Sequence, residues 1–205
     1  MKIFAFVDLH GDMPLLNNII TKVKKEKPKY IICAGDISIF GQHLEILCQK
    51  LNKLNIPVLM IHGNHEDEAE IAAVARKMKN IKNMHNRYEV DGKYIFLCYG
   101  GGGFALFNKK FENTTAKKFK TAVAKLKKKH KDAKVIFVTH GPPHKTKLDR
   151  IHGSSAGCKS LRKFIREVQP DLAICGHLHE NAGKKDKIGN SLIYHPGWEG
   201  KFFEV

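Results

Sequence analysis

The chain has 205 residues, 42% of them hydrophobic and 27% charged, and its formal net charge is +16. These values are typical of one soluble globular domain, residues 1–205, and exclude both a disordered chain and a membrane-spanning helix, which needs roughly 20 apolar residues in a row. The apolar run 3–7 is too short for the apolar region of a signal peptide, so we expect a cytoplasmic protein.

Strand-like and helix-like segments alternate in the N-terminal part of the chain. Each apolar run of strand length is followed by a segment whose apolar residues recur every three or four positions, as on one face of a helix. Because this alternation is typical of βαβ units, it predicts a parallel sheet. The predicted elements are, in order, strand 3–7, helix 14–24, strand 30–34, helix 44–54, strand 58–61 and helix 66–78.

Hairpins and further helices are expected in the second part of the chain. Asp91-Gly92 predicts the turn of a hairpin within residues 88–99. The glycine run 100–103 matches no phosphate-binding pattern, so we interpret it as a tight turn or a close backbone approach. The remaining predicted elements are helix 115–130, strand 135–138, loop 140–157, helix 158–168, strand 171–175 and a hairpin-like end with strand 191–194. All the elements together predict an α/β fold in which two packed β-sheets are flanked by helices.

The cysteines carry no sign of disulfide or metal chemistry. Cys33, Cys98 and Cys175 lie in strand-like runs, whereas Cys48 and Cys158 lie in helix-like segments. Their number is odd and none forms a CxxC motif. We therefore expect buried free thiols in a reducing compartment.

The positive charge comes mainly from lysine. The chain has 36 basic and 20 acidic residues, and only five of the basic residues are arginines. Specific recognition of nucleic acids favours arginine, which makes two parallel hydrogen bonds to one base. We therefore interpret the lysines as a solvated surface, and a polyanionic partner such as nucleic acid remains the alternative.

Polar side chains follow five of the predicted strands, usually with glycine beside them. Because ligands bind at the carboxyl ends of parallel strands, we expect these side chains to share one cleft. Imidazole, carboxylate and amide groups together suit Mn, Fe, Zn or Ni better than Ca or Mg, and seven such groups are too many for one ion. The seven residues are Asp8, His10, Asp36, Asn64, His140, His177 and His179.

Taken singly, each of these motifs has an ordinary structural explanation. Two residues apart in extended chain, His177 and His179 point to the same side and could chelate one ion or simply belong to a turn. Gly35-Asp36 is also a common turn, and the residues around Asn64 could open a helix. The joint occurrence of such motifs at five strand ends favours a site for two metals.

The five motifs resemble those of the calcineurin-like metallophosphoesterase family. They are Asp8-x-His10, Gly35-Asp36, Gly63 to Glu66, His140 to Pro143 and Gly176-His177-x-His179. The segments 148–155 and 195–197 also resemble its small single-domain prokaryotic members. This resemblance implies a four-layer αββα fold with two mixed sheets. It also implies hydrolysis of phosphate monoesters or diesters by a hydroxide that bridges two divalent transition metals, with manganese expected first and Fe, Zn or Ni as alternatives.

The resemblance also assigns roles to individual residues. One metal would be bound by Asp8, His10, Asp36 and His179, and the other by Asp36, Asn64, His140 and His177. His65, next to Asn64, would assist catalysis by protonating the leaving oxygen or by stabilising charge. We expect Glu66 to cap a helix or to support the ligands from behind. His144 and His152 lie in the loop that passes the site, where they could contact substrate or be exposed to solvent.

Two other functions keep the same residues but change their use. A metal-dependent nuclease would explain the +16 charge, although no nucleic-acid-binding appendage is visible. A non-catalytic binding protein with a metal scaffold is expected to have lost ligands, and none is missing here. We expect a small phosphoester or nucleotide substrate and no membrane partner; monoesters and diesters, like the oligomeric state, stay open at this point.

Overall fold

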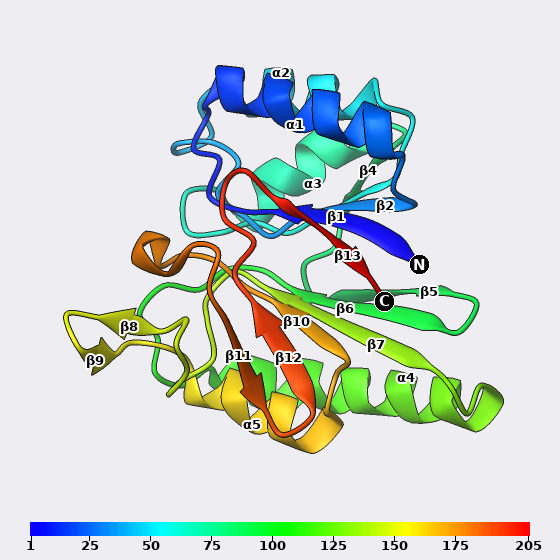
Figure 1. Ribbon diagram of the computed structural model, residues 1–205, viewed down its shortest axis with the longest axis vertical. Helices are drawn as coiled ribbons and strands as arrows, with labels where there is room; N and C mark the ends of the chain where they lie inside the picture. The colour runs from blue at the N-terminus through cyan, green and yellow to red at the C-terminus, as the bar shows by residue number, and fades with distance from the viewer.

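Two mixed β-sheets lie between two layers of helices in the computed structural model, which describes residues 1–205 (Figure 1). The helices are α1 (Met13–Glu26), α2 (Leu44–Asn52), α3 (Glu68–Arg76), α4 (Ala116–Lys129) and α5 (Lys159–Val168). The first three cover the outer face of one sheet, and the last two cover the outer face of the other. The expected fold, two packed mixed sheets flanked by helices, is confirmed.

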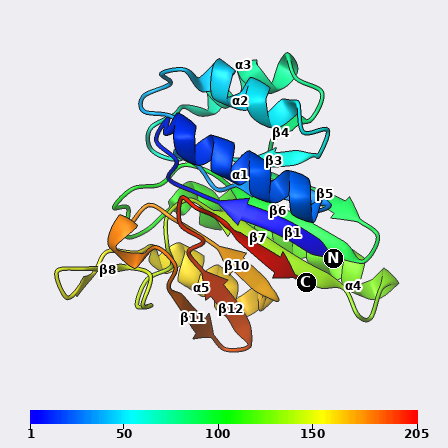
Figure 2. The ribbon, with the colours of Figure 1, turned by 45° about the horizontal axis from the view of Figure 1, so that its top comes forward.

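Five strands form the first sheet. They are β1 (Lys2–Phe6), β2 (Tyr30–Cys33), β3 (Val58–Met60), β4 (Ile81–Asn83) and β13 (Lys201–Glu204). Their order is β13-β1-β2-β3-β4, in which β1 to β4 are parallel and β13 runs antiparallel to β1. This pairing brings the two chain ends together (Figure 2), and the Met1 amino group donates to the Val205 carbonyl oxygen at 2.7 Å.

Six strands form the second sheet. They are β5 (Arg87–Asp91), β6 (Tyr94–Tyr99), β7 (Lys134–Thr139), β10 (Leu172–Ile174), β11 (Lys185–Ile188) and β12 (Ser191–Tyr194). Their order is β11-β12-β10-β7-β6-β5, with four parallel strands in the middle and an antiparallel strand at each edge. A small hairpin, β8 (Arg150–Ile151) and β9 (Ser154–Ser155), projects from the predicted loop 140–157.

Three apolar clusters correspond to the three interfaces between the four layers. One lies between the first sheet and its helices, with Leu16, Ile19 and Val23 of α1 at its centre. A second packs α4 and α5 on the second sheet. The third lies between the sheets and contains residues such as Ile32 and Ile136. The central parallel strands are therefore buried on both faces, which explains why they read as continuous apolar runs in the sequence.

Helix starts follow local capping chemistry. Helix α1 begins where the Asp12 side chain accepts a hydrogen bond from the Leu15 N–H at 2.8 Å. Helix α3 begins at Glu68 instead of residue 66, because Asp67 is its N-cap and forms a reciprocal capping box with Glu70. The expected role of Glu66 as a helix cap is therefore wrong, since Asp67 takes that position.

Short and edge strands account for most other differences from the expected elements. Strand β4 and the pairing of β13 with β1 have no counterpart among the predicted strands, whereas the antiparallel pair β11–β12 forms the expected hairpin-like end. The hairpin around Asp91-Gly92 is confirmed. The glycine run does approach another backbone closely: a Cβ at Gly100 would lie 2.8 Å from the His62 carbonyl oxygen.

All five cysteines are free and buried, as expected from their number and spacing in the sequence, and burial raises the pKa of the Cys48 thiol to about 12. Each of them therefore behaves as a small apolar side chain. None of the five helices has the length and apolar character needed to cross a membrane.

Candidate metal centre

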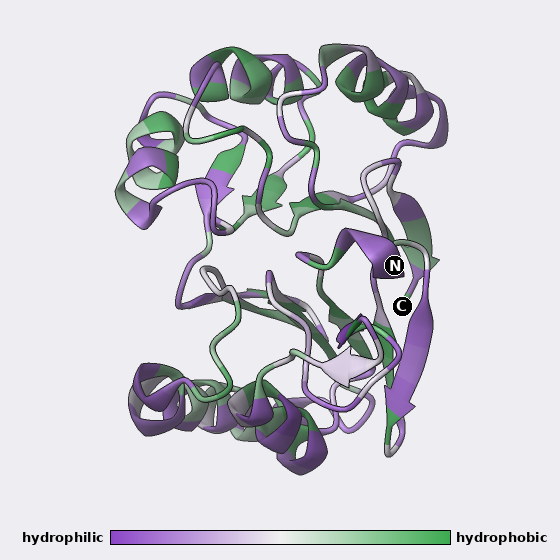
Figure 3. Cartoon of the chain, turned by 90° about the vertical axis from the view of Figure 1, so that its left-hand side faces the viewer, coloured by the Kyte–Doolittle hydropathy of each residue, from purple (hydrophilic) through white to green (hydrophobic).

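The carboxyl ends of five strands converge at one side of the molecule. Strands β1, β2 and β3 belong to the first sheet, whereas β7 and β10 belong to the second. Figure 3 looks onto this side and shows the loops between the upper and lower halves. Because both sheets point their parallel strands toward the same edge, the seven predicted ligands come together there.

One group of side chains surrounds the ring nitrogens of His10 and His179. Their Nε2 atoms lie 3.0 Å apart. The Asp8 Oδ1 atom is 3.9 Å from His179 Nε2, and the Asp36 Oδ2 atom is 4.0 Å from His10 Nε2. Two imidazoles and two carboxylates therefore face a common point, which is a donor set that suits a divalent transition metal.

A second group meets at the Asn64 amide oxygen. His140 Nε2 lies 3.0 Å from Asn64 Oδ1, and His177 Nδ1 lies 2.7 Å from the same atom. Asp36 completes the group, with its Oδ2 atom 3.2 Å from His140 Nε2. The same Asp36 oxygen therefore faces both groups of side chains.

The hydrogen bonds of His140 test whether this cluster fits a cation. Its Nδ1 atom lies 2.9 Å from the Ala34 carbonyl oxygen, so Nδ1 carries the hydrogen. In the neutral ring, Nε2 then presents a lone pair to two oxygen atoms, Asp36 Oδ2 and Asn64 Oδ1. Three acceptors that face one another in a buried site repel each other unless a proton or a metal ion lies among them. Without a metal the proton takes this place: burial lowers the pKa of His140, but the hydrogen bond and charge of Asp36 outweigh it and raise the pKa. The residues therefore fit a metal.

Burial and neighbouring charges shift the pKa values of the cluster in different directions. Burial raises the pKa of Asp8 to about 6, against the lowering effect of His140. Burial also acts on Asp36, but the hydrogen bond and charge of His140 outweigh it and hold its pKa at about 2. Burial lowers the pKa of His177 to about 4. His177 is consequently neutral near pH 7, as a metal ligand must be.

Four of the seven side chains project from left-handed backbone. The φ angles are 56° at Asp8, 49° at His10, 51° at Asp36 and 73° at His177. This conformation costs of order 1 to 3 kcal/mol for a residue other than glycine and is concentrated at functional sites. The sharp turn after each strand directs the side chain into the cluster. Gly35, at φ 100°, is part of one such turn, and a Cβ there would lie 2.7 Å from His140 Nδ1.

Glu66 connects the loops that carry two of the ligands. Its buried carboxylate accepts hydrogen bonds from the backbone N–H groups of Asp36 at 3.1 Å, Ser38 at 2.7 Å and Gly63 at 3.3 Å. It also accepts from the Ser38 hydroxyl at 2.8 Å. The carboxylate thereby fixes the backbone on both sides of the cluster, in agreement with the expected supporting role.

His195, to which the sequence assigned no function, lies beside Asp8. Its ring is fully buried, and its Nδ1 atom accepts the Gly197 N–H at 3.2 Å. The hydrogen of the neutral ring is therefore on Nε2, which lies 3.6 Å from Asp8 Oδ2. Burial lowers the pKa of His195 to about 4, so the ring stays neutral. The segment 195–197 was the only signal in the sequence that pointed to it.

His65 stands at the edge of the cluster. Its backbone N–H donates to Asp36 Oδ1 at 2.9 Å, and its ring centroid lies 4.7 Å from that of His10. The buried Nδ1 atom of the ring has no hydrogen-bond partner within the protein. One of its ring nitrogens also lies within 4.8 Å of ligand atoms of His10 and Asp36. A catalytic role for His65 is compatible with this position and stays a prediction.

The two loop histidines occupy different environments. His144 Nδ1 is buried and lies 3.6 Å from Asp149 Oδ2. His152 is exposed in the turn between β8 and β9. Neither ring has a hydrogen bond or ion pair with the seven clustered side chains, so their contact with substrate stays a prediction.

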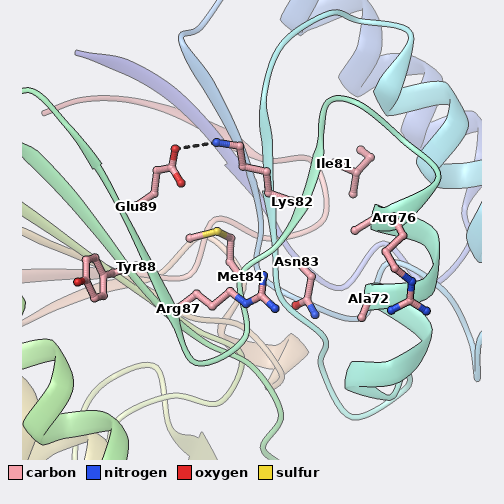
Figure 4. A pocket seen from close by; sticks show the side chains of 10 residues that line it. Ala72, Arg76, Ile81, Lys82, Asn83, Met84, Arg87, Tyr88 and Glu89 are labelled. Carbon is pink, nitrogen blue, oxygen red and sulfur yellow. Dashed lines mark hydrogen bonds and ion pairs between the residues drawn. The ribbon is translucent and has the colours of Figure 1, made fainter.

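One cavity lies away from the cluster. It has a volume of about 450 Å³ and lies between α3, β4 and β5 (Figure 4). Arg76, Arg87, Asn83 and Tyr88 are among the residues that line it. None of the seven predicted ligands does, so this cavity is separate from the candidate metal centre.

Comparison with known proteins gives one family and one curated relative. Residues 1–181 match the profile of the calcineurin-like phosphoesterase family. The chain is 24% identical over 192 residues to the glycerophosphodiester phosphodiesterase GpdQ of Enterobacter lignolyticus. That match covers 87% of this chain but 65% of the relative, so the chain spans slightly less than two thirds of its length.

Solved structures with low sequence identity share the fold. A protein of Thermus thermophilus superposes with a TM-score of 0.73 at 16% identity, covering 96% of this chain and 88% of that chain. A dimetal phosphatase from Danio rerio gives a TM-score of 0.68 at 11% identity, covering 94% and 86% of the two chains. The family profile covers most of the sequence, and the chain therefore belongs to the calcineurin-like phosphoesterase family.

Proposed function

We propose that the protein is a metal-dependent phosphohydrolase that cleaves phosphate monoesters or diesters at a dinuclear centre. The position of Asp36 carries this proposal, because its Oδ2 atom lies 3.2 Å from His140 Nε2 and 4.0 Å from His10 Nε2. One carboxylate oxygen between two sets of nitrogen ligands suits a bridge between two ions. Membership of the family and the likeness to a phosphodiesterase support the reaction class.

The seven clustered residues divide into two ligand sets that share Asp36. Asp8, His10, Asp36 and His179 would hold one ion, and Asp36, Asn64, His140 and His177 would hold the other. When bound, such ions neutralise phosphate charge and lower the pKa of the attacking water. We propose manganese, with Fe, Zn or Ni as alternatives, because the set mixes imidazole with carboxylate and amide oxygen.

The side chains around the ligands would hold and orient the reacting groups. His65, at the edge of the cluster, would donate a proton to the leaving oxygen. Asn64 would contribute an amide oxygen to one ligand set, and its neighbour in the chain, His65, would therefore lie close to the reacting groups. Glu66 and His195 would help to keep Asp36 and Asp8 in place, since the Glu66 carboxylate accepts the Asp36 backbone N–H at 3.1 Å and His195 Nε2 lies 3.6 Å from Asp8 Oδ2.

Chelation and reconstitution test the reaction. The protein loaded with manganese is expected to hydrolyse p-nitrophenyl phosphate or bis-p-nitrophenyl phosphate. Treatment with a chelator should abolish this activity, and added Mn²⁺ should restore it, with magnesium as the comparison ion. Absence of hydrolysis of both compounds, while metal analysis finds two ions per chain, would contradict the proposal.

Single substitutions of the two neighbouring histidines test the division into ligand sets. His177→Ala and His179→Ala should each weaken the binding of one ion by roughly 10-fold or more and leave the other ion bound. Metal titration followed by isothermal calorimetry would measure the two affinities separately. His43→Ala provides the control, because this ring lies at the exposed start of α2. Loss of the same ion from both variants would show that the assignment is incorrect.

The net charge of +16 favours one alternative substrate, a nucleic acid. The lysine-rich helix α4, however, covers the outer face of the second sheet, and its last turn carries Lys127, Lys128 and Lys129. In Figure 1 this turn lies at the right, whereas the carboxyl ends of the parallel strands point to the left. We therefore place the nuclease second, and assays on single- and double-stranded DNA and RNA distinguish it.

The unpaired thiols favour a reducing compartment, and we propose the cytoplasm.

A further inference from the structure

Exposed apolar side chains are concentrated around the metal centre. Nine large apolar side chains are exposed in the whole chain, and six of them lie in three loops: Ile39, Phe40, Phe104, Leu106, Phe107 and Trp198. These loops follow β2, β6 and β12. Apolar surface gathered in one place is unfavourable in water and commonly marks a binding surface.

Three of the exposed rings contact histidines of the centre. The Phe40 ring centroid lies 4.6 Å from that of His65, and the Phe104 centroid lies 5.0 Å from that of His177. The Trp198 ring centroid lies 6.2 Å from that of His179. We call Phe40, Phe104 and Trp198 the aromatic rim. The rim approaches both proposed ligand sets and the proposed proton donor, each from a different loop.

Much of each rim ring remains free for a ligand. Phe40 is 73% exposed, Phe104 is 68% exposed and Trp198 is 39% exposed. Flat rings with free faces stack on other planar groups, and such stacking is specific in geometry. An aliphatic chain would gain only from the apolar area that it buries on these rings, whereas an aromatic group would also gain from the ring–ring geometry. Ile39 and Leu106 are the only aliphatic members of the six exposed side chains.

We propose that the aromatic rim binds an aromatic group esterified to the phosphate, so that the enzyme prefers aryl-substituted phosphoesters. This inference rests on the proposed hydrolysis and names the substrate class of the same site. The phosphate would face the clustered histidines and carboxylates, and its aromatic substituent would lie against Phe40, Phe104 and Trp198. The rim thus determines which ester binds, whereas the ligand sets serve every phosphoester alike.

A series of diesters with one leaving group tests the preference. We would compare p-nitrophenyl methyl, p-nitrophenyl hexyl and p-nitrophenyl phenyl phosphate with the metal-loaded protein, because only the second ester group changes. The phenyl diester should exceed the methyl diester in kcat/KM by about tenfold, which corresponds to one favourable aromatic contact. The substitutions Phe40→Ala, Phe104→Ala and Trp198→Ala should each reduce this ratio, and the triple variant should bring it close to one.

An exposed aromatic residue elsewhere provides the matched control. Tyr88 is 43% exposed and lines the cavity of Figure 4, away from the centre. Tyr88→Ala should leave both kcat/KM and the phenyl-to-methyl ratio unchanged. A hexyl diester cleaved as efficiently as the phenyl diester would identify an alkyl chain as the occupant and overturn the aromatic assignment.

Binding can be followed without turnover, because Trp198 is the only tryptophan of the chain. Phenylphosphonate should change its fluorescence at a concentration at least several-fold lower than methylphosphonate. Equal responses, together with equal hydrolysis of methyl and phenyl diesters, would refute the rim and leave the proposed hydrolysis intact. A selective response to phenylphosphonate with no hydrolysis of any diester would refute the hydrolysis and support the rim as a binding site.

Discussion

Replacing Asp36 with asparagine is expected to remove both metal ions and to lower kcat/KM for phosphoesters by about 10³-fold or more. The Oδ2 atom of Asp36 faces His140 and His10, which belong to the two proposed ligand sets. An amide at this position removes the negative charge that both sets share. The substitution preserves the shape of the side chain, and its remaining oxygen can still accept the His65 N–H. Loss of metal would therefore report on the bridge and not on the fold.

Metal analysis and circular dichroism would check this result together. Asp132→Asn is the matched control, because this carboxylate pairs with Lys93 at the surface and is remote from the centre. It should keep two ions and full activity. If the Asp36 variant still bound two ions with wild-type affinity, the proposal that Asp36 bridges them would fail.

Replacing His65 with alanine should have the opposite signature, with both metals retained and turnover greatly reduced. General acid catalysis by a histidine contributes about 10²- to 10⁴-fold, and we expect a decrease in kcat within that range. The ring is not needed to complete either proposed ligand set. If it protonates the leaving oxygen, the loss should be larger for phenyl phosphate than for p-nitrophenyl phosphate, whose leaving group needs no proton.

The dependence on the leaving group separates two roles for His65. An equal loss for both esters would favour stabilisation of charge on the phosphoryl group over proton donation. His43→Ala serves here as a histidine substitution outside the site and should retain full turnover. Wild-type turnover of a metal-loaded His65 variant would exclude a catalytic role for this residue.

The alternation of apolar runs and amphipathic segments was sufficient to predict the central strands and all five helices. Buried parallel strands are recognisable because both faces are apolar, as in residues 3–7. Strand β4 is a short edge strand, and its composition does not distinguish it from a loop. The pairing of β13 with β1 joins the two chain ends, and no local pattern encodes such a distant partner.

The candidate site was predictable in composition but not in geometry. Polar residues directly after apolar strands indicated all seven clustered side chains, because strand direction determines where a strand ends. The left-handed turns at Asp8 and His177 were not visible, since neither residue type requires that conformation. The hydrogen bonds of Glu66 to Asp36 and Ser38 were also not predictable, because they join segments that follow different strands.

The convergence of both sheets on one cluster has a consequence for the cohesion of the molecule. Asp8, His10, Asp36 and Asn64 follow strands of the first sheet, and His140, His177 and His179 follow strands of the second. Each proposed ligand set takes side chains from both sheets. Bound ions would therefore link the two halves in addition to their apolar interface and hydrogen bonds such as that of His140 to the Ala34 carbonyl oxygen. An ion that binds only the folded state stabilises it by about 4 kcal/mol when the free ion concentration is 1,000 times the dissociation constant. Removal of the metals should then lower the free energy of unfolding of the whole protein as well as its activity.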